Sequence, residues 1–254
     1  MGEYSKTFVQ GLEWMWGEGF MSPGGVEEVE AILQDVDLTG KRVLDIGCGI
    51  GGIDLLLVQK FGASHVTGID VEAPLVTQAN QNIARAGLQD QVSAYLVDAG
   101  PLPFPTDSFD VVFSKDSIIH IPDKKGIYAE MFRVLRSGGQ VAFSDWFFSN
   151  APKTPEFAEW YEVFGLTVEM GVIEDAATLL ESVGFVDVTC NDRNAWYAKN
   201  IEEELAAIEG ENYPKLEAAI GAEAAAQRVK SSRLKKVVVD KGQLRPGHVR
   251  GRKG

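Results

Sequence analysis

A short glycine-rich stretch holds the first residues that could do chemistry. Residues 43–52 read VLDIGCGIGG, an apolar run that leads into four glycines. Glycines let the backbone turn sharply and approach a ligand closely, and the helix that follows points its N-terminus at the same place. Gly47 and Gly49 are therefore predicted to bind the nucleotide part of a cofactor. Because a plain tight turn has the same composition, the neighbouring residues must decide.

Acidic residues stand at the ends of the next two predicted strands. Asp70 lies about 20 residues past the turn, where a carboxylate accepts hydrogen bonds from ribose hydroxyls. Asp98 and Ala99 follow the third strand, where the adenine would lie. NAD fits the same layout, but Asp45 directly precedes the turn, and an acid there suits a cationic ligand. We therefore predict S-adenosylmethionine, which carries a sulfonium and an ammonium group, as the cofactor, and S-adenosylhomocysteine as its product.

Three sequence strings resemble known methyltransferases. The DxGxGxG pattern resembles motif I of the class I S-adenosylmethionine-dependent methyltransferases. GEGFMSPGG at residues 17–25 and SKDSIIH at 114–120 resemble phosphoethanolamine N-methyltransferases and sarcosine/dimethylglycine N-methyltransferases. The resemblance covers nearly the whole chain and implies that the N-terminal segment folds over the cofactor as a lid. The residues it places at the methionine part are Met21, Ser22 and, beside the carboxylate, Lys115.

The same resemblance places two residues at the reacting nitrogen. They are Tyr4, ahead of the lid, and His120, in the second long string. An amine must lose a proton before its lone pair can attack a methyl group, and histidine is a suitable acceptor because its charge changes near neutral pH. Asp116 lies one helical turn before His120 and either orients its ring or holds the substrate ammonium. Without the resemblance, His120 fits a helix cap equally well.

The chain departs from the phosphoethanolamine enzymes at the residues that the resemblance assigns to phosphate binding. Three tyrosines and an arginine there correspond here to Trp146, Trp160, Phe164 and Leu166. Phe164 cannot replace the bidentate hydrogen bonds of an arginine. We therefore expect N-methylation of a small unphosphorylated amine, such as a methylated amino acid or amino alcohol of the sarcosine or dimethylglycine type.

Three other functions stay open. One is phosphoethanolamine-type N-methylation, and the second is S- or O-methylation of another small metabolite. The third is a module that binds an adenosyl ligand or NAD without catalysis, which would have no use for Asp116 and His120.

Several aromatic rings suit a methylated ammonium. Cation–π attraction is worth roughly 0.5 to 2 kcal/mol per ring. The candidate rings are Trp14, Trp16, Phe20, Trp146 and Trp160. Core packing is the simpler interpretation for Trp14, Trp16 and Trp196.

Charge is unevenly distributed along the chain. The formal net charge is −13, which disfavours nucleic acid as a partner. Residues 228–254 nevertheless carry ten Lys or Arg and one acid. Either this basic segment docks on the acidic remainder of the protein, or one of its cations, Arg228, anchors an anionic group of the substrate.

Strand and helix patterns alternate along the chain, which predicts a parallel sheet. Strands are expected at 41–46, 65–70, 92–97, 109–114, 140–146 and 186–190, and helices at 53–60, 73–86, 124–136, 173–183, 195–209 and 213–239. The resemblance adds an antiparallel closing strand at 247–253. The predicted fold is α/β, a Rossmann-like seven-stranded methyltransferase sheet with helices on both faces, an N-terminal lid helix and a helical substrate cap.

Length and composition fit one domain. At 254 residues and 45% hydrophobic content, we predict a single domain 1–254, with a lid (1–26), a cofactor-binding core (40–150), and a cap with closing strands (151–254). No apolar run approaches the roughly 18 residues of a membrane helix, and the start does not read as a leader, so the expectation is a cytoplasmic monomer or homodimer without membrane contact. Cys48 and Cys190 are expected to be packed thiols, with no metal site.

Overall fold

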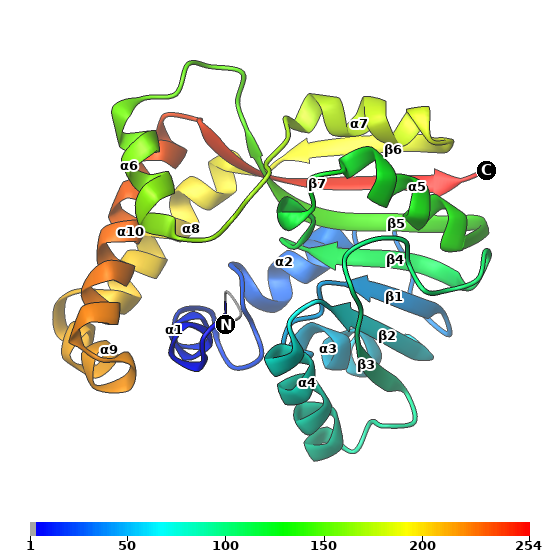
Figure 1. Ribbon diagram of the computed structural model, residues 1–254, viewed down its shortest axis with the longest axis horizontal. Helices are drawn as coiled ribbons and strands as arrows, with labels where there is room; N and C mark the ends of the chain where they lie inside the picture. The colour runs from blue at the N-terminus through cyan, green and yellow to red at the C-terminus, as the bar shows by residue number, and fades with distance from the viewer. Residues whose placement is uncertain (1–3) are drawn as a thin grey trace.

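Seven strands form one sheet in the part of the chain that the computed structural model describes, residues 4–254 (Figure 1). The strands are β1 (Arg42–Ile46), β2 (His65–Asp70), β3 (Val92–Leu96), β4 (Phe109–Lys115), β5 (Leu135–Phe148), β6 (Phe185–Asp192) and β7 (Leu244–Lys253). Their order is β3-β2-β1-β4-β5-β7-β6. β1 to β5 pair in parallel, and β7 runs antiparallel to β5 and β6. The predicted sheet and its antiparallel closing strand are confirmed.

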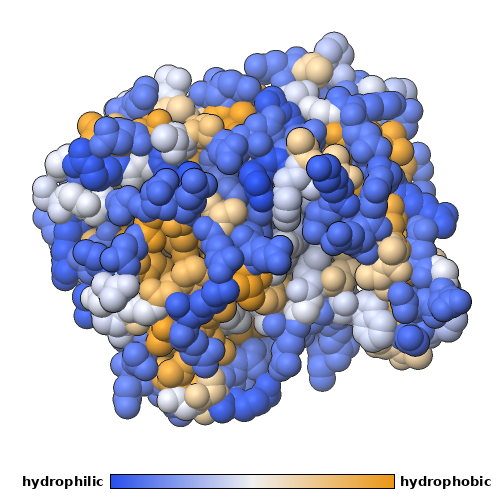
Figure 2. Space-filling view, turned by 180° about the vertical axis from the view of Figure 1, so that it is seen from behind, coloured by the Kyte–Doolittle hydropathy of each residue, from blue (hydrophilic) through white to orange (hydrophobic). Residues whose placement is uncertain are grey.

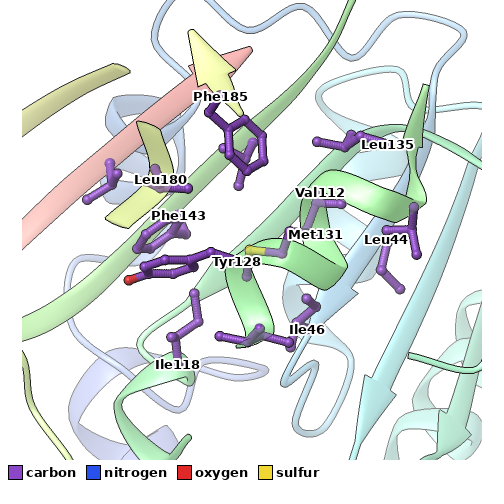
Figure 3. Packing of buried hydrophobic residues seen from close by; sticks show 14 of the residues in the cluster. Leu44, Ile46, Val112, Ile118, Tyr128, Met131, Leu135, Phe143, Leu180 and Phe185 are labelled. Atoms are coloured by element: carbon purple, nitrogen blue, oxygen red, sulfur yellow. The ribbon is translucent and has the colours of Figure 1, made fainter. Parts of the chain in front are cut away.

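Helices cover both faces of the sheet, as the alternating pattern predicts. On one face lie α2 (Gly25–Ile32), α3 (Gly52–Gln59) and α4 (Ala73–Ala86), whose apolar residues share a core cluster with β1 and β2. On the other face lie α5 (Lys124–Val134) and α7 (Ile173–Ser182). Figure 3 shows Tyr128 and Met131 of α5 packed among residues of the sheet. Central strands buried on both faces read as continuous apolar runs, which is why β1 is recognisable from sequence.

A separate group of helices stands beside the ends of the strands, at the left of Figure 1. It comprises α6 (Pro155–Phe164), α8 (Asn194–Ile208), α9 (Tyr213–Ile220) and α10 (Ala222–Asp240), and we call it the cap. Its own apolar core contains Trp160, Tyr197 and Val238. Helix α1 (Lys6–Trp16) contacts α8, α9 and α10 of the cap. The lid residues 1–3 lie outside the described part of the chain.

Some predicted elements differ from the structure. The helix expected at 213–239 is two helices, because Gly221 between α9 and α10 adopts φ 87° and ends the first. α5 ends at Val134, where β5 begins, rather than at residue 136. Helices α2 and α6 were not in the predicted set of elements. Cys48 is buried as expected, but Cys190 is exposed on β6, so the prediction of a packed thiol there was wrong.

The surface carries mostly hydrophilic residues. Figure 2, seen from behind, shows hydrophobic side chains gathered mainly in one region at the lower left. No helix between residues 4 and 254 combines the length and the hydropathy needed to cross a bilayer.

Candidate functional site

Two cavities meet where the lid, the sheet and the cap come together. The larger, about 830 Å³, lies at the glycine turn and the carboxyl ends of β1, β2 and β4. The smaller, about 300 Å³, lies between the lid, α6 and α10. We call them the cofactor cavity and the acceptor cavity. Five residues line both: Tyr4, Met21, Ser22, Asp116 and His120. A group passing from one cavity to the other would pass these side chains, all of which the sequence had indicated.

The glycine turn and Asp70 form one side of the cofactor cavity. Gly47 adopts φ 80° and Gly49 φ 55°, conformations that favour glycine. The Asp70 carboxylate accepts hydrogen bonds from the Gly49 N–H and the Glu72 N–H, both at 2.9 Å. Burial raises the pKa of Asp70, and these two N–H donors oppose that shift. Each Asp70 oxygen keeps a lone pair for a further donor, as a ribose-binding carboxylate requires. Asp98 and Ala99 line the same cavity.

Asp45 lies elsewhere than its predicted role requires. Its side chain is 1% exposed and lines neither cavity. It faces Asp54, the buried acid of α3, and burial raises the pKa of both carboxyls. Two adjacent buried carboxyls cannot both ionise cheaply, so the pair retains a proton. From this position Asp45 does not contact a ligand in either cavity, so its predicted direct contact with the cofactor was wrong.

The lid packs directly on the glycine turn. A Cβ atom on Gly49 would lie 2.8 Å from the Met21 Sδ, and one on Gly52 would collide with the backbone of Gly19. Met21 and Ser22 are thus held over the mouth of the cofactor cavity, as predicted from the lid string.

Lys115 fastens the lid to the sheet. Its ammonium donates to the Ser22 Oγ at 2.6 Å, the Pro23 carbonyl at 2.9 Å and the Asp116 Oδ2 at 2.8 Å. The side chain is 2% exposed. These three bonds use all three N–H donors of a lysine, so a cofactor carboxylate could bind Lys115 only by replacing one of them.

Tyr4 and His120 form a hydrogen-bonded pair. The Tyr4 hydroxyl lies 3.1 Å from the His120 Nε2, and the His120 Nδ1 lies 2.7 Å from the Thr167 carbonyl oxygen. A carbonyl oxygen can only accept, so Nδ1 carries a proton. In the neutral ring Nε2 is then unprotonated and accepts from the Tyr4 hydroxyl. The predicted pair is therefore assembled, with Nε2 ready to take up a proton.

Asp116 connects the pair's surroundings to β5. Its Oδ1 accepts from the Ser144 Oγ at 2.9 Å, and its φ of 55° is unusual for a residue other than glycine. Thr167, not Asp116, is the hydrogen-bond partner that orients the His120 ring. Of the two roles predicted for Asp116, holding an ammonium remains, because its carboxylate lines both cavities.

The residues at the predicted phosphate positions line the acceptor cavity. They are Trp146, Trp160, Phe164 and Leu166. Trp160 stacks on Phe164, with ring centroids 5.1 Å apart. Trp16 also lines this cavity, and its Nε1 donates to the Glu204 Oε1 at 3.0 Å. Trp16 is therefore partly buried and also faces the cavity.

Other predicted rings lie outside the acceptor cavity. Trp14 is 40% exposed, so neither the core nor the pocket interpretation holds. Trp196 packs beneath the Arg193 guanidinium at 4.7 Å in the cap, as the core interpretation requires. Phe20 packs against the core beside α2 and α3.

Arg228 differs from the other cations of the basic segment. Eight of the ten form ion pairs with carboxylates: Lys230, Arg233, Lys235, Lys236, Lys241, Arg245, Arg252 and Lys253. Arg250 donates to the carbonyls of Ile32 and Ala31. Arg228 lines the acceptor cavity. Within residues 4–254 its guanidinium donates a 3.4 Å hydrogen bond to the Phe8 carbonyl and lies 4.7 Å from the Phe8 ring. Burial lowers the pKa of Arg228 to about 10, which leaves it charged at neutral pH.

Most cations of the basic segment thus pair with acidic residues. Arg228 lines the acceptor cavity, and its role as an anchor for an anion stays a prediction.

Sequence reasoning missed three groups at the site. Thr167 acts through its backbone carbonyl, which no residue letter reveals. Ser144 lies on β5 and was not linked to Asp116. Lys235 also lines the acceptor cavity, and its spacing of seven residues from Arg228 on one helix was a signal that could have identified it. No cluster of potential metal ligands occurs among residues 4–254.

Comparisons with known proteins agree with this geometry. A family model described as a methyltransferase domain matches residues 37–207. Phosphoethanolamine N-methyltransferase 1 of Arabidopsis thaliana is 34% identical over 212 residues, which are 82% of this chain and 42% of the relative. The chain spans less than half the length of the first curated relatives it matches.

Solved structures show the same fold. Phosphoethanolamine N-methyltransferase 2 of Haemonchus contortus, in complex with phosphomonomethylethanolamine and S-adenosylhomocysteine, superposes with a TM-score of 0.92 at 26% identity, covering 99% of this chain and 58% of that one. A candidate sarcosine dimethylglycine methyltransferase of Galdieria sulphuraria gives 0.76 at 21% identity, covering 89% and 83%. The second likeness concerns the fold alone.

Proposed function

The chain belongs to the methyltransferase domain family, and from this premise we propose that it transfers a methyl group from S-adenosylmethionine to the nitrogen of a small amine that carries an anionic group. The observation that carries the proposal is the Tyr4–His120 pair at the junction of the two cavities. A chain that only bound the cofactor would not need a proton acceptor there.

The cofactor cavity has the residues to hold S-adenosylmethionine. Asp70 would accept from the ribose hydroxyls, Asp98 and Ala99 would lie at the adenine, and Met21 and Ser22 would cover the methionine part. The cavity is large enough for a ligand of this size. When bound, the cofactor supplies a methyl group on a positively charged sulfur.

The chain's own residues would deprotonate the amine. The substrate ammonium would share the Asp116 carboxylate with Lys115 and donate to the Tyr4 hydroxyl. As that hydroxyl passes its proton to the His120 Nε2, it takes one from the ammonium, and the Thr167 carbonyl stabilises the resulting imidazolium through Nδ1–H. The freed lone pair can then face the cofactor cavity.

The anionic group distinguishes the substrate candidates. Phosphoethanolamine-type relatives favour a phosphate over the unphosphorylated amine that Phe164 suggested. The cavity supplies a cation for it from α10 rather than from α6, because Arg228 has no carboxylate partner among the ion pairs of the described residues. A phosphate or a carboxylate bound there would gain charge-assisted hydrogen bonds.

Steady-state assays of S-adenosylhomocysteine release test the proposal. We expect turnover of phosphoethanolamine, sarcosine or dimethylglycine, and a KM about tenfold higher or more for ethanolamine, which lacks the anion. Arg228→Gln should raise the KM of the anionic amines toward that of ethanolamine, while Arg233→Gln on the outer ion pair should not. Mass spectrometry of the product must place the new methyl group on nitrogen. A methylated oxygen or sulfur, or cofactor binding without turnover of any amine, would contradict the proposal.

A further inference from the structure

The titratable groups that line the acceptor cavity lie on two separate walls. One wall holds Tyr4, Asp116 and His120 at the junction with the cofactor cavity. The other is a face of α10 that carries Arg228 and Lys235, seven residues apart and therefore on one side of the helix. A zwitterionic acceptor would place its amine at the first wall and its anion at the second.

The two cations of α10 differ in availability. Lys235 lies 3.2 Å from the Glu204 carboxylate, whose side chain is 3% exposed, so its charge is already compensated. Arg228 lies about two helical turns away along α10. The Glu204 charge also acts on Arg228, but the two form no ion pair, and the close contacts of the guanidinium are the carbonyl and the ring of Phe8. The anion should therefore bind Arg228.

Two aromatic side chains in series separate the reacting end from Arg228. The Tyr4 ring lies 5.7 Å from the Phe8 ring, edge to face, and the Phe8 ring lies 4.7 Å from the Arg228 guanidinium. An acceptor that reaches both His120 and Arg228 must pass along this pair of rings. A link longer than the two carbons of phosphoethanolamine would make more contact along that path.

The wall between the two poles is apolar. On α1, Phe8, Leu12 and Met15 are spaced by four and three residues, so they form one stripe along the cavity. Across the cavity, Val163, Phe164 and Leu166 complete an apolar lining. This stripe stabilises a hydrocarbon chain. Gln227, Ser231 and Ser232 of α10 also line the cavity and can donate hydrogen bonds to an anion beside Arg228.

We propose, building on the proposed N-methyl transfer, that the acceptor is an amine whose nitrogen and anionic group are joined by a hydrocarbon spacer longer than the two carbons of phosphoethanolamine. The spacer packs along the α1 stripe, the anion binds Arg228, and the amine binds at Asp116 and Tyr4. This assigns the four substitutions by Trp146, Trp160, Phe164 and Leu166 a role in accommodating the spacer.

A series of ω-aminoalkyl phosphates with two, three, four and six carbons tests the spacer length. We expect kcat/KM to rise about threefold to fourfold per added methylene, the gain for burying one CH₂, up to an optimum beyond two carbons. Arg228→Gln should abolish this dependence on length. Lys230→Gln, which removes the exposed ion pair of α10 with Glu159, is the matched control, and it should keep the same optimum.

Three results would overturn the inference. One is a kcat/KM that is highest for phosphoethanolamine and falls with each carbon. Another is an optimum that moves with Lys235→Gln but not with Arg228→Gln. The third is a preference for branched two-carbon amines over extended ones. In all three cases amine methylation itself stands, whereas S-adenosylhomocysteine binding by calorimetry without turnover of any amine would instead remove the proposed function.

Discussion

The hydrogen bond between Tyr4 and His120 runs from the hydroxyl to the ring because the backbone carbonyl of Thr167 holds the proton of the other ring nitrogen. The Thr167 carbonyl at 2.7 Å fixes the Nδ1 proton and so leaves Nε2 as acceptor. Without this carbonyl, the neutral ring could adopt its other tautomer, in which Nε2 carries the proton and points an N–H toward Tyr4. The position of the loop after α6 thus determines whether His120 can act as a base.

Replacing His120 by Ala should lower kcat at pH 7 by about 100-fold, because proton acceptance belongs to the transition state. The rate should recover partly at high pH, where the free amine is abundant. Tyr4→Phe should lower kcat too, since it removes the hydroxyl 3.1 Å from Nε2. Rapid-quench assays with calorimetry of S-adenosylhomocysteine as control would measure this. Equal rates at pH 7 for the parent and His120→Ala would remove the catalytic role.

Asp70→Ala should weaken binding of S-adenosylhomocysteine by roughly 2 to 3 kcal/mol, the value of two charge-assisted hydrogen bonds. Asp70→Asn is the matched control for shape, and it should retain part of the affinity. Both affinities are measurable by calorimetry, with circular dichroism to check the glycine turn, which Asp70 also holds through the Gly49 N–H. Parent-like affinity of Asp70→Ala would refute the ribose assignment.

Residue identities predicted the site where the chemistry resides in the side chain itself. Asp70 and His120 fall into that class, and each lines the expected cavity. Asp45 does not, because the competing carboxyl of Asp54 comes from the next helix and its proximity is a property of the fold. Thr167 was unpredictable, since any residue type could offer the same carbonyl.

At the scale of the elements, the lid is held to the sheet by one buried cation. Lys115 lies at the end of β4 and bonds two consecutive lid residues, Ser22 and Pro23. It bonds Asp116 at the same time, so closure of the lid and the charge of the proposed ammonium site are linked.

Lys115→Met should loosen the lid and raise the KM for S-adenosylmethionine by tenfold or more, through loss of about 1.5 to 3 kcal/mol of hydrogen bonding to a charged group. Hydrogen exchange of residues 17–25 should become faster in the variant. Lys60→Met, which breaks an exposed ion pair with Glu30, is the control and should leave those amides unchanged. Exchange in the lid that is equal in both variants would show that other contacts hold it.

The elements of the sheet were easier to predict than those of the cap. Buried parallel strands have a distinctive apolar composition, whereas the long pattern at 213–239 hid a break that depends on Gly221 alone. A glycine inside an Ala-rich stretch is compatible with a continuous helix, and packing against α1 and α6 decides between the two. The break matters, because it sets the direction of α10 and hence the place of Arg228.

At the scale of the whole molecule, the buried pair of Asp45 and Asp54 makes stability depend on pH. Burial raises the pKa of Asp45 to about 7, above its ordinary value of 3.8. The folded protein therefore keeps a proton that the unfolded chain releases, and the free energy of unfolding should fall as pH rises from about 4 to 7.

Asp45→Asn should flatten this decline, because the amide cannot ionise. The gain relative to the parent should be absent near pH 4 and reach at most about 4 kcal/mol by pH 8, with the coupling to Asp54 reducing it. Urea unfolding at pH 5, 6.5 and 8 would measure the difference, with the exposed Asp90→Asn as control. If the free energies of unfolding of the parent and of Asp45→Asn differed by the same amount at all three pH values, ionisation of Asp45 would not be the cause.

The reactivity of the Cys48 thiol can measure how often the glycine turn opens. Its thiol packs against Gly68 in the core beneath the turn. Burial together with Asp54 and Asp45 raises the pKa of the thiol, so it stays protonated and inert while the turn is closed. In a Cys190→Ser variant, the rate at which an added reagent alkylates Cys48 would measure how often the glycine turn opens. S-Adenosylhomocysteine at 100 times its Kd should lower the rate of Cys48 alkylation about 100-fold if the turn can open only after the ligand has left. The alkylation rate would thus report occupancy of the cofactor cavity without turnover of a substrate.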